Sequence, residues 1–305
     1  MKILVFTEKP FAAAAVKAIL NVINAAGAEM KLVERGTHQD LLEAVKDADA
    51  LIVRSDIVDA EVMNAAPQLK VVVRAGAGYD NIDLQAATNH GICVMNTPGQ
   101  NSNAVAELVF GMIVMMCRNK YNGTSGSELK GKSLGIYAFG QVGRNVARIA
   151  KGFGMRLQAL DLFVPDEVMT KEGVKPVHDV NSLFEENDFV SLHIPATPQT
   201  KNSIGYDLVI KMPENGVLVN TARKEVIDEE GLFKALKERP DLRYVSDIKP
   251  AMADEFEKHF ADRVFFTPKK MGAQTAEANF NAGVAAAEQA IAFLKDGWNK
   301  FQVNK

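Results

Sequence analysis

The chain has 305 residues, of which 47% are hydrophobic, and 35 basic against 38 acidic side chains give it a formal net charge of −3 at pH 7. This length suits two domains with separate cores, and the small, mixed charge favours a small-molecule partner over a nucleic acid or a membrane surface. Two cysteines without metal-ligand spacing, no signal-peptide pattern and no membrane-length apolar run predict a cytoplasmic protein without zinc or disulfide bonds.

The first hundred residues alternate short β-branched runs with helical patterns. Strands are predicted at KILVF, KLVE, ALIVRS and KVVVRAG, and helices at 16–23, 40–45 and 62–66. The strands are continuously apolar, which is typical of a parallel sheet covered by helices on both faces. The N-terminal third is therefore expected to be α/β.

A long apolar helix and a second α/β series follow. Residues 101–119 begin with Asn and Ser, which suit a helix N-cap, and are apolar almost all the way round, so we expect this helix to be buried between domains. A surface linker rich in Gly and Ser comes next. Six more strands are predicted, near SLGIYA, RLQALD, FVSLHIP, GVLVNTA, RYVSDI and RVFFTP. An alanine-rich helix from Ala273 to about Leu294 is expected to return to the first domain.

The strand LGIYA leads into AFGQVG, a G-x-G-x-x-G loop whose first glycine is replaced by Ala138. Such a loop lets the backbone approach a pyrophosphate at the N-terminus of the next helix, although tight helix-strand packing alone could also account for it. The predicted cofactor-binding residues here are Gly140, Gln141, Val142 and Gly143. Ala138 fits the first turn only if its φ is negative. Asp161 ends the following strand, where a carboxylate would bind ribose hydroxyls and repel a 2′-phosphate, so the pattern favours NAD over NADP.

Several motifs in order resemble the D-isomer-specific 2-hydroxyacid dehydrogenase family, most closely its phosphoglycerate dehydrogenase branch. They are Arg54-Ser55, RAGAGYDNID, NTPGQNSNAVAE, ELKGKSLGI, LHIPATPQT, NTARKEVID and TPKKMGAQTAEA. The resemblance implies two doubly wound parallel-sheet domains, with residues 1–98 and 279–305 binding substrate and a Rossmann domain at 99–278 binding NAD. It also implies a homodimer. Because the chain stops at residue 305, we expect it to lack the regulatory extension of longer phosphoglycerate dehydrogenases.

The resemblance implies that Arg223 clamps the substrate carboxylate, for which a planar guanidinium is well suited. The family also has a histidine two residues before the glycine of P-H-x-G, and a glutamate in an E-P dipeptide. This chain has neither: lysines occupy the histidine's place, with Lys269 reached by counting from Pro268 and Lys270 by counting from Gly272. Which of the two points into the site is left open.

A lysine could take over the proton transfer. Free lysine has a pKa of about 10.4, so it is a ready acid and a poor base near neutral pH. Desolvation and a neighbouring cation such as Arg223 could lower that pKa to about 7.5. A carboxylate would act in the opposite direction, which would account for the loss of the glutamate. We therefore hypothesise that Lys269 or Lys270 is the acid/base.

Further site residues follow from the resemblance and from their positions at strand ends. The expected substrate-binding residues are Arg54, Ser55, Ala75, Gly76 and Asn96. The remaining expected cofactor-binding residues are His193, Pro195, Thr200, Thr221, Ala222, Asp247 and Gly272.

The sequence thus predicts NAD-dependent oxidation of 3-phospho-D-glycerate to 3-phosphohydroxypyruvate in serine biosynthesis, or the reverse reaction. The alternative within the same enzyme class is a reductase of glyoxylate or hydroxypyruvate. An NAD-sensing binding protein without turnover is the alternative from another class, but such a sensor would not need the carboxylate clamp Arg223.

Overall fold

The computed structural model describes residues 1–304. The chain forms two compact units, one made of Met1–Asn101 with Gln274–Lys305 and the other of Ser102–Ala273. We call them unit 1 and unit 2. The sequence placed the boundaries after residues 98 and 278, a few residues from those of the structure.

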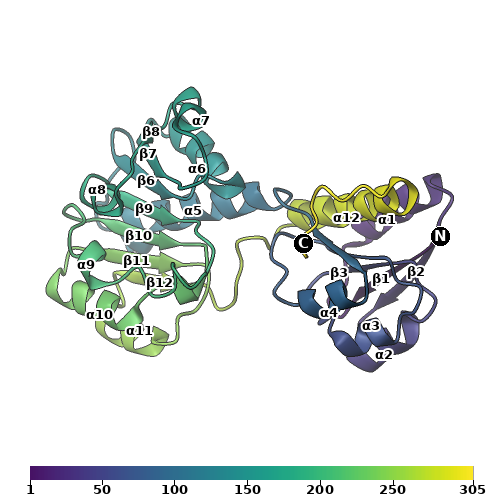
Figure 1. Ribbon diagram of the computed structural model, residues 1–305. Coiled ribbons are helices and arrows are strands. Elements are labelled where there is room, and N and C mark those ends of the chain that lie inside the picture. Colours follow the sequence, from purple (N-terminus) through teal and green to yellow (C-terminus); the bar gives the residue numbers. More distant parts are fainter. Residues whose placement is uncertain (305) are drawn as a thin grey trace. The chain divides into compact units, whose positions relative to one another are not determined.

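Unit 1 is built on a five-stranded parallel sheet in the order β2-β1-β3-β4-β5 (Figure 1). Its strands are β1 (Lys2–Thr7), β2 (Glu29–Glu34), β3 (Ala50–Val53), β4 (Val71–Arg74) and β5 (Cys93–Asn96). Its helices are α1 (Ala13–Ala25), α2 (His38–Ala44), α3 (Ala60–Asn64), α4 (Leu84–Asn89) and α12 (Ala276–Asp296). Neighbouring strand residues such as Leu51 and Ile52 are both fully buried but belong to separate clusters, one on each face of the sheet. This explains why the strands read as continuous apolar runs.

The C-terminal helix α12 belongs to unit 1, as the sequence predicted. It packs against α1 and against strands β3 and β4. Beyond it, the side chain of Asn304 accepts a hydrogen bond from Val94 N at 2.8 Å and donates one to Ile92 O at 2.8 Å. The end of the chain is thereby attached to the edge strand β5.

Unit 2 has a seven-stranded parallel sheet in the order β12-β11-β10-β9-β6-β7-β8. Its strands are β6 (Ser133–Tyr137), β7 (Arg156–Leu160), β8 (Lys175–Pro176), β9 (Phe189–Leu192), β10 (Val217–Asn220), β11 (Arg243–Ser246) and β12 (Val264–Phe266). Its α-helices are α5 (Ser102–Cys117), α6 (Gln141–Gly152), α7 (Asp166–Lys171), α8 (Val180–Glu185), α9 (Tyr206–Val209), α10 (Glu229–Glu238) and α11 (Ala253–Phe260). Short 3₁₀ turns lie at Asn119–Tyr121 and Lys224–Val226. The strand order reverses between β6 and β9, which is the Rossmann pattern, and the predicted fold class is confirmed.

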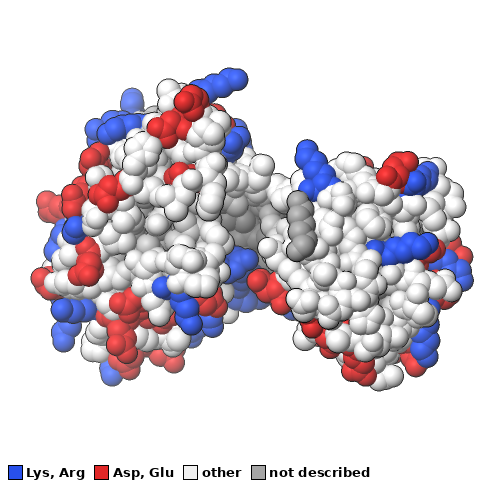
Figure 2. Space-filling view, in the orientation of Figure 1, with Lys and Arg blue, Asp and Glu red and all other residues white. Residues whose placement is uncertain are grey.

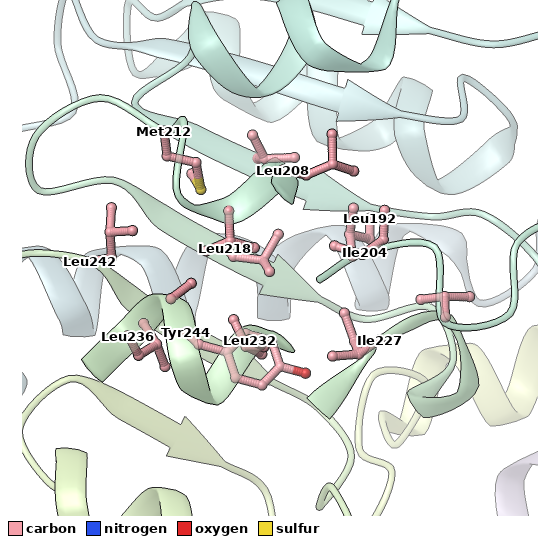
Figure 3. Close-up of a cluster of buried hydrophobic side chains, with 14 of the residues drawn as sticks. Leu192, Ile204, Leu208, Met212, Leu218, Ile227, Leu232, Leu236, Leu242 and Tyr244 are labelled. Atoms are coloured by element: carbon pink, nitrogen blue, oxygen red, sulfur yellow. The ribbon is translucent and has the colours of Figure 1, made fainter. Parts of the chain in front are cut away.

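One face of the unit 2 sheet is covered by a large apolar cluster, part of which is drawn in Figure 3. Leu192 from β9, Leu218 from β10 and Tyr244 from β11 pack there with Leu232 and Leu236 from α10. The opposite face is covered by α5 and α6. This buried framework holds the carboxyl ends of β6, β9 and β10 in place, and in such folds ligands bind beyond those ends.

The surface of α5 corrects one expectation. Its apolar positions run round the helix, yet Gly111 and Glu107 are exposed and Leu108, Val114 and Met115 are half-buried. The helix is therefore not buried on all sides within the chain. None of the helices formed by residues 1–304 is both long enough and apolar enough to cross a membrane. Acidic and basic side chains are interspersed over both units on the face shown in Figure 2.

Candidate active site

The loop from β6 to α6 contains two glycines with different reasons to be there. A Cβ on Gly143 would lie 2.3 Å from Ala138 O, so the packing of the helix on the loop requires a glycine. Gly140 is the N-cap of α6, has a φ of −74°, and has no atom within 4 Å of a built Cβ. Neither backbone strain nor packing therefore explains Gly140. An open approach to the N–H groups at the start of α6 does explain it, and this is what a pyrophosphate needs.

Ala138 does not have the negative φ that the sequence argument required. Its φ is +79°, a left-handed conformation that glycine adopts freely and alanine adopts at a cost of about 1–2 kcal/mol. The turn keeps the glycine geometry although the glycine is missing. The expectation was wrong because the loop's hydrogen bonds, including Ala138 N to Leu160 O at 2.8 Å, impose this backbone conformation.

Replacing Ala138 by Gly is therefore expected to stabilise unit 2 by about 1 kcal/mol, because the relief of strain exceeds the burial lost with one half-exposed methyl group. Thermal unfolding should show a rise in Tm of roughly 2–4 °C. Ala65→Gly is the matched control, since Ala65 is also half-buried but has a φ of −75°, and it should lower Tm. An unchanged or lower Tm for Ala138→Gly would contradict the strain.

Asp161 holds the loop together from the end of β7. Its Oδ2 accepts a hydrogen bond from Phe139 N at 2.7 Å, and its Oδ1 accepts from Phe163 N at 2.8 Å and Val164 N at 3.0 Å. The carboxylate is thus fixed beside the glycine loop, where a ribose would lie. A carboxylate in this position suits the exclusion of a 2′-phosphate.

The predicted cofactor residues that follow β9 and β10 form a hydrogen-bonded group. His193 Nε2 lies 3.0 Å from Ser191 Oγ, and its Nδ1 lies 3.4 Å from Thr221 Oγ1. Desolvation lowers the pKa of His193 from 6.5 to about 3, so this imidazole is neutral at physiological pH. Thr200 Oγ1 donates to Pro195 O at 2.5 Å and thereby shapes the loop after β9. A neutral, half-buried histidine suits a structural or cofactor-side duty better than proton transfer.

The side chains of Arg223 and Lys270 both donate a hydrogen bond to the backbone oxygen of Ala222. Arg223 Nη1 donates to Ala222 O at 3.0 Å, and Lys270 Nζ donates to the same oxygen at 2.8 Å. Arg223 follows β10 directly, whereas Lys270 follows β12, so the sheet brings together groups 47 positions apart. Lys269 is exposed and contributes its backbone oxygen, which accepts a hydrogen bond from Thr267 Oγ1 at 2.7 Å. The geometry therefore favours Lys270 as the lysine beside Arg223.

Asp247, which the sequence analysis placed among the cofactor-binding residues, interacts electrostatically with both cations. Asp247 is fully buried; its Oδ2 accepts from Gly272 N at 2.9 Å, and its Oδ1 has no hydrogen-bond donor. Desolvation raises the pKa of Asp247, while the charges of Lys270 and Arg223 and the Gly272 hydrogen bond act in the opposite direction. A Cβ on Gly272 would lie 2.5 Å from that Oδ2, so the glycine is required here. The idea that the lysine's surroundings contain cations but no carboxylate must be corrected.

In unit 1 the predicted substrate residues lie at the carboxyl ends of β3, β4 and β5. Arg54 Nη1 donates to Lys9 O at 2.9 Å and Pro10 O at 3.0 Å, and its Nη2 donates to Asn279 Oδ1 at 2.5 Å. These bonds tie the loop after β1 to α12, a structural role that the sequence did not show. Ser55 is exposed next to it.

A second arginine, Arg74, is the last residue of β4 and lies next to the loop that follows this strand. Ala75 is buried, and Gly76 has a φ of +149° and lies so close to Arg74 that a Cβ there would be 1.4 Å from Arg74 Nη1. Asn96 Nδ2 donates to Ala77 O at 2.6 Å and steadies the same loop. Arg74 is a candidate site residue that the sequence reasoning missed, although it is the first residue of the RAGAG motif.

The family model for the D-isomer specific 2-hydroxyacid dehydrogenase catalytic domain matches residues 3–304. The chain belongs to this family. Within the family it is 40% identical to the D-3-phosphoglycerate dehydrogenase of Methanocaldococcus jannaschii over 83% of this chain and 51% of that protein, so it spans about half the length of that relative. It is 36% identical to the hydroxypyruvate reductase of Thermotoga maritima, over 82% of this chain and 86% of that protein.

Among solved structures, the chain is similar to the NAD⁺-bound 3-phosphoglycerate dehydrogenase of Entamoeba histolytica. The TM-score is 0.90 and the identity is 48%, with 100% of this chain and 99% of that chain covered. The predicted family is confirmed, and the cofactor in that structure agrees with the one predicted here. The exchange of the family's histidine for a lysine stays a prediction, and it concerns the group around Ala222 O.

Proposed function

We propose that this chain is an NAD-dependent D-2-hydroxyacid dehydrogenase that interconverts 3-phospho-D-glycerate and 3-phosphohydroxypyruvate in the cytoplasm, as a step of serine biosynthesis. The observation that carries the proposal is the convergence of Arg223 Nη1 and Lys270 Nζ on Ala222 O. In this arrangement a guanidinium that can bind a carboxylate lies beside an amine that can donate a proton. Both belong to unit 2, which also contains the glycine loop. The phosphoglycerate dehydrogenases of Methanocaldococcus jannaschii and Entamoeba histolytica support the choice of substrate.

Each residue of the proposed site has a role in binding or catalysis that suits its chemistry. Arg223 binds the substrate carboxylate through its planar fork and polarises the adjacent carbonyl. In the reductive direction Lys270 donates a proton to the carbonyl oxygen, and in the oxidative direction its neutral amine accepts the hydroxyl proton. NAD, when bound, supplies the hydride acceptor or donor. Gly140 leaves the start of α6 open to its pyrophosphate, and Asp161 receives its ribose.

Asp161→Ala should relax the preference for NAD, because it removes the charge that opposes a 2′-phosphate. The ratio of kcat/KM with NADH to that with NADPH is expected to fall by about tenfold or more, which corresponds to about 1.4 kcal/mol. Asp161→Asn is the matched control that keeps the size and most hydrogen bonds of the side chain. Unchanged selectivity in both variants would show that the ribose is held elsewhere.

A second candidate activity is reduction of hydroxypyruvate or glyoxylate, which the Thermotoga maritima relative supports. The two are separated by following NADH absorbance with a panel of 2-oxo acids. Turnover of phosphohydroxypyruvate in clear preference to hydroxypyruvate and glyoxylate supports the first proposal, and the reverse order supports the second. Binding of NADH without turnover of any 2-oxo acid would instead support an NAD-sensing protein.

We also propose that the enzyme is a homodimer and that α5 is part of its interface. The outer face of this helix has Leu108, Val114 and Met115 half-buried around the exposed Gly111, with the exposed Glu107 one turn before it. Within residues 1–304, and apart from the chain neighbours and the backbone of α5 itself, no atom lies within 4 Å of a Cβ built on Gly111, so a side chain there is tolerated by the monomer. Gly111→Arg should therefore leave the fold intact and convert dimers to monomers in light scattering, whereas Gly111→Ala should not. Dimers that persist in the arginine variant would rule out this face.

A further inference from the structure

The exchange of an imidazole for a primary amine gives this site a reaction that histidine cannot perform. Substrates of 2-hydroxyacid dehydrogenases in the oxidised state are carbonyl compounds, and a neutral lysine amine condenses with carbonyls to form imines. Lys270 is exposed at its surface, so it can be reached by a small molecule. Its Nζ shares the acceptor Ala222 O with Arg223.

The guanidinium of Arg223 and the amine of Lys270 lie close together, because both donate to Ala222 O. A 2-oxo acid held by its carboxylate on the Arg223 guanidinium has its carbonyl carbon one bond away from the bound group. The carbonyl is then presented next to Lys270 at a high effective concentration. Lys269 is exposed as well, but it is Lys270 whose Nζ shares an acceptor with Arg223.

We propose that Lys270 is a covalent modification site for aldehydic 2-oxo acids, of which glyoxylate is the simplest, and that its imine reversibly inactivates the enzyme. This inference rests on the proposed function, since it uses the same clamp and the same amine. The amine lone pair attacks the aldehyde carbon, the carbonyl π pair moves to oxygen, and a proton passes from nitrogen to that oxygen. The hydroxyl group then leaves with the second nitrogen proton as water, and a C=N bond remains. An aldehyde reacts faster than a ketone because its carbonyl carbon carries a hydrogen in place of a second carbon substituent.

Lys270 thereby discriminates between 2-oxo acids by the reactivity of their carbonyl groups. Ketonic 2-oxo acids such as phosphohydroxypyruvate bind and are reduced, whereas glyoxylate ties up the proton donor. Inactivation should depend on time, need no cofactor, be relieved by dilution, and grow with rising pH as the neutral amine becomes populated.

Reductive trapping tests the proposal. The wild-type protein is incubated with glyoxylate and sodium cyanoborohydride, which delivers hydride to the imine carbon and leaves a carboxymethyl group on the amine. Peptide mass mapping is expected to find Lys270 labelled about tenfold faster than Lys269. Lys269→Arg should be labelled like the wild type, Lys270→Arg should lose the label at this position, and oxalate, which occupies a carboxylate clamp but has no aldehyde, should protect.

Arg223→Gln should slow labelling of Lys270 about tenfold. Equal labelling of the two lysines, or labelling that is insensitive to both Arg223→Gln and oxalate, would overturn the proposal. Failure here and failure of the proposed function are distinguishable. Absence of label in a protein whose reductase activity requires Lys270 would refute the modification site alone, and selective labelling in a protein whose Lys270→Met variant keeps full activity would refute the catalytic role alone.

Discussion

Lys270→Met is expected to lower kcat/KM for reduction of phosphohydroxypyruvate by about 10²–10⁴-fold, because it removes the group that donates a proton to the carbonyl oxygen. Methionine keeps a similar length and loses the ammonium charge. Binding of NADH, followed by fluorescence, should change little, since the glycine loop and Asp161 lie on other strand ends. Steady-state kinetics at several pH values give the measurement.

The adjacent lysine supplies the control. Lys269→Met should stay within about twofold of the wild type, because both lysine side chains are exposed but it is Lys270 Nζ that donates to Ala222 O beside Arg223. If Lys269→Met were the impaired variant, the assignment of the two lysines would be reversed. If both variants were normal, neither lysine would be the acid/base.

Arg223→Gln is the substitution with the second large effect. It is expected to lower kcat/KM by about 10²–10³-fold, through a higher KM from the lost carboxylate clamp and a lower kcat from the lost polarisation of the carbonyl. Arg223 Nη1 donates a hydrogen bond to the preceding residue at Ala222 O. Because the clamp acts on the substrate, the loss is expected in the kinetics, and Tm is measured alongside as the check for a structural role.

Arg223→Lys is the matched variant because it keeps the charge and loses the planar fork. It should recover only part of the activity, since an ammonium cannot bind a carboxylate in the bidentate manner. Full activity in the lysine variant would mean that charge alone suffices. A large drop in Tm for Arg223→Gln would indicate a structural role instead.

The sequence predicted those features for which a residue pattern is typical of a single structure. Continuous apolar runs predicted the parallel strands, and the glycine loop with Asp161 predicted the Rossmann unit. The helices α7, α8 and α9, of 6, 6 and 4 residues, were not predicted, although the equally short α2 and α3 were. The strand β8, with two residues, is equally invisible.

The sequence did not predict the features of the site that depend on contacts between residues far apart in the chain. Asp247 and Lys270 are 23 positions apart, and their electrostatic coupling follows from the neighbouring strands β11 and β12. The left-handed Ala138 could not be read either, because a sequence shows a substitution and not the backbone conformation that the surroundings impose. Arg54 resembles a ligand-binding arginine in sequence, but its hydrogen bonds show a structural use.

Chemical rescue tests the central claim, that the ammonium of Lys270 supplies the proton. Lys270→Ala removes the amine and leaves space for a small alkylamine, so added methylamine or ethylamine should restore reduction of phosphohydroxypyruvate in a saturable manner. The rescued rate should depend on the pKa of the amine, as expected for general acid catalysis. If no amine restores activity in a Lys270→Ala protein that still binds NADH and substrate, Lys270 is not the proton donor.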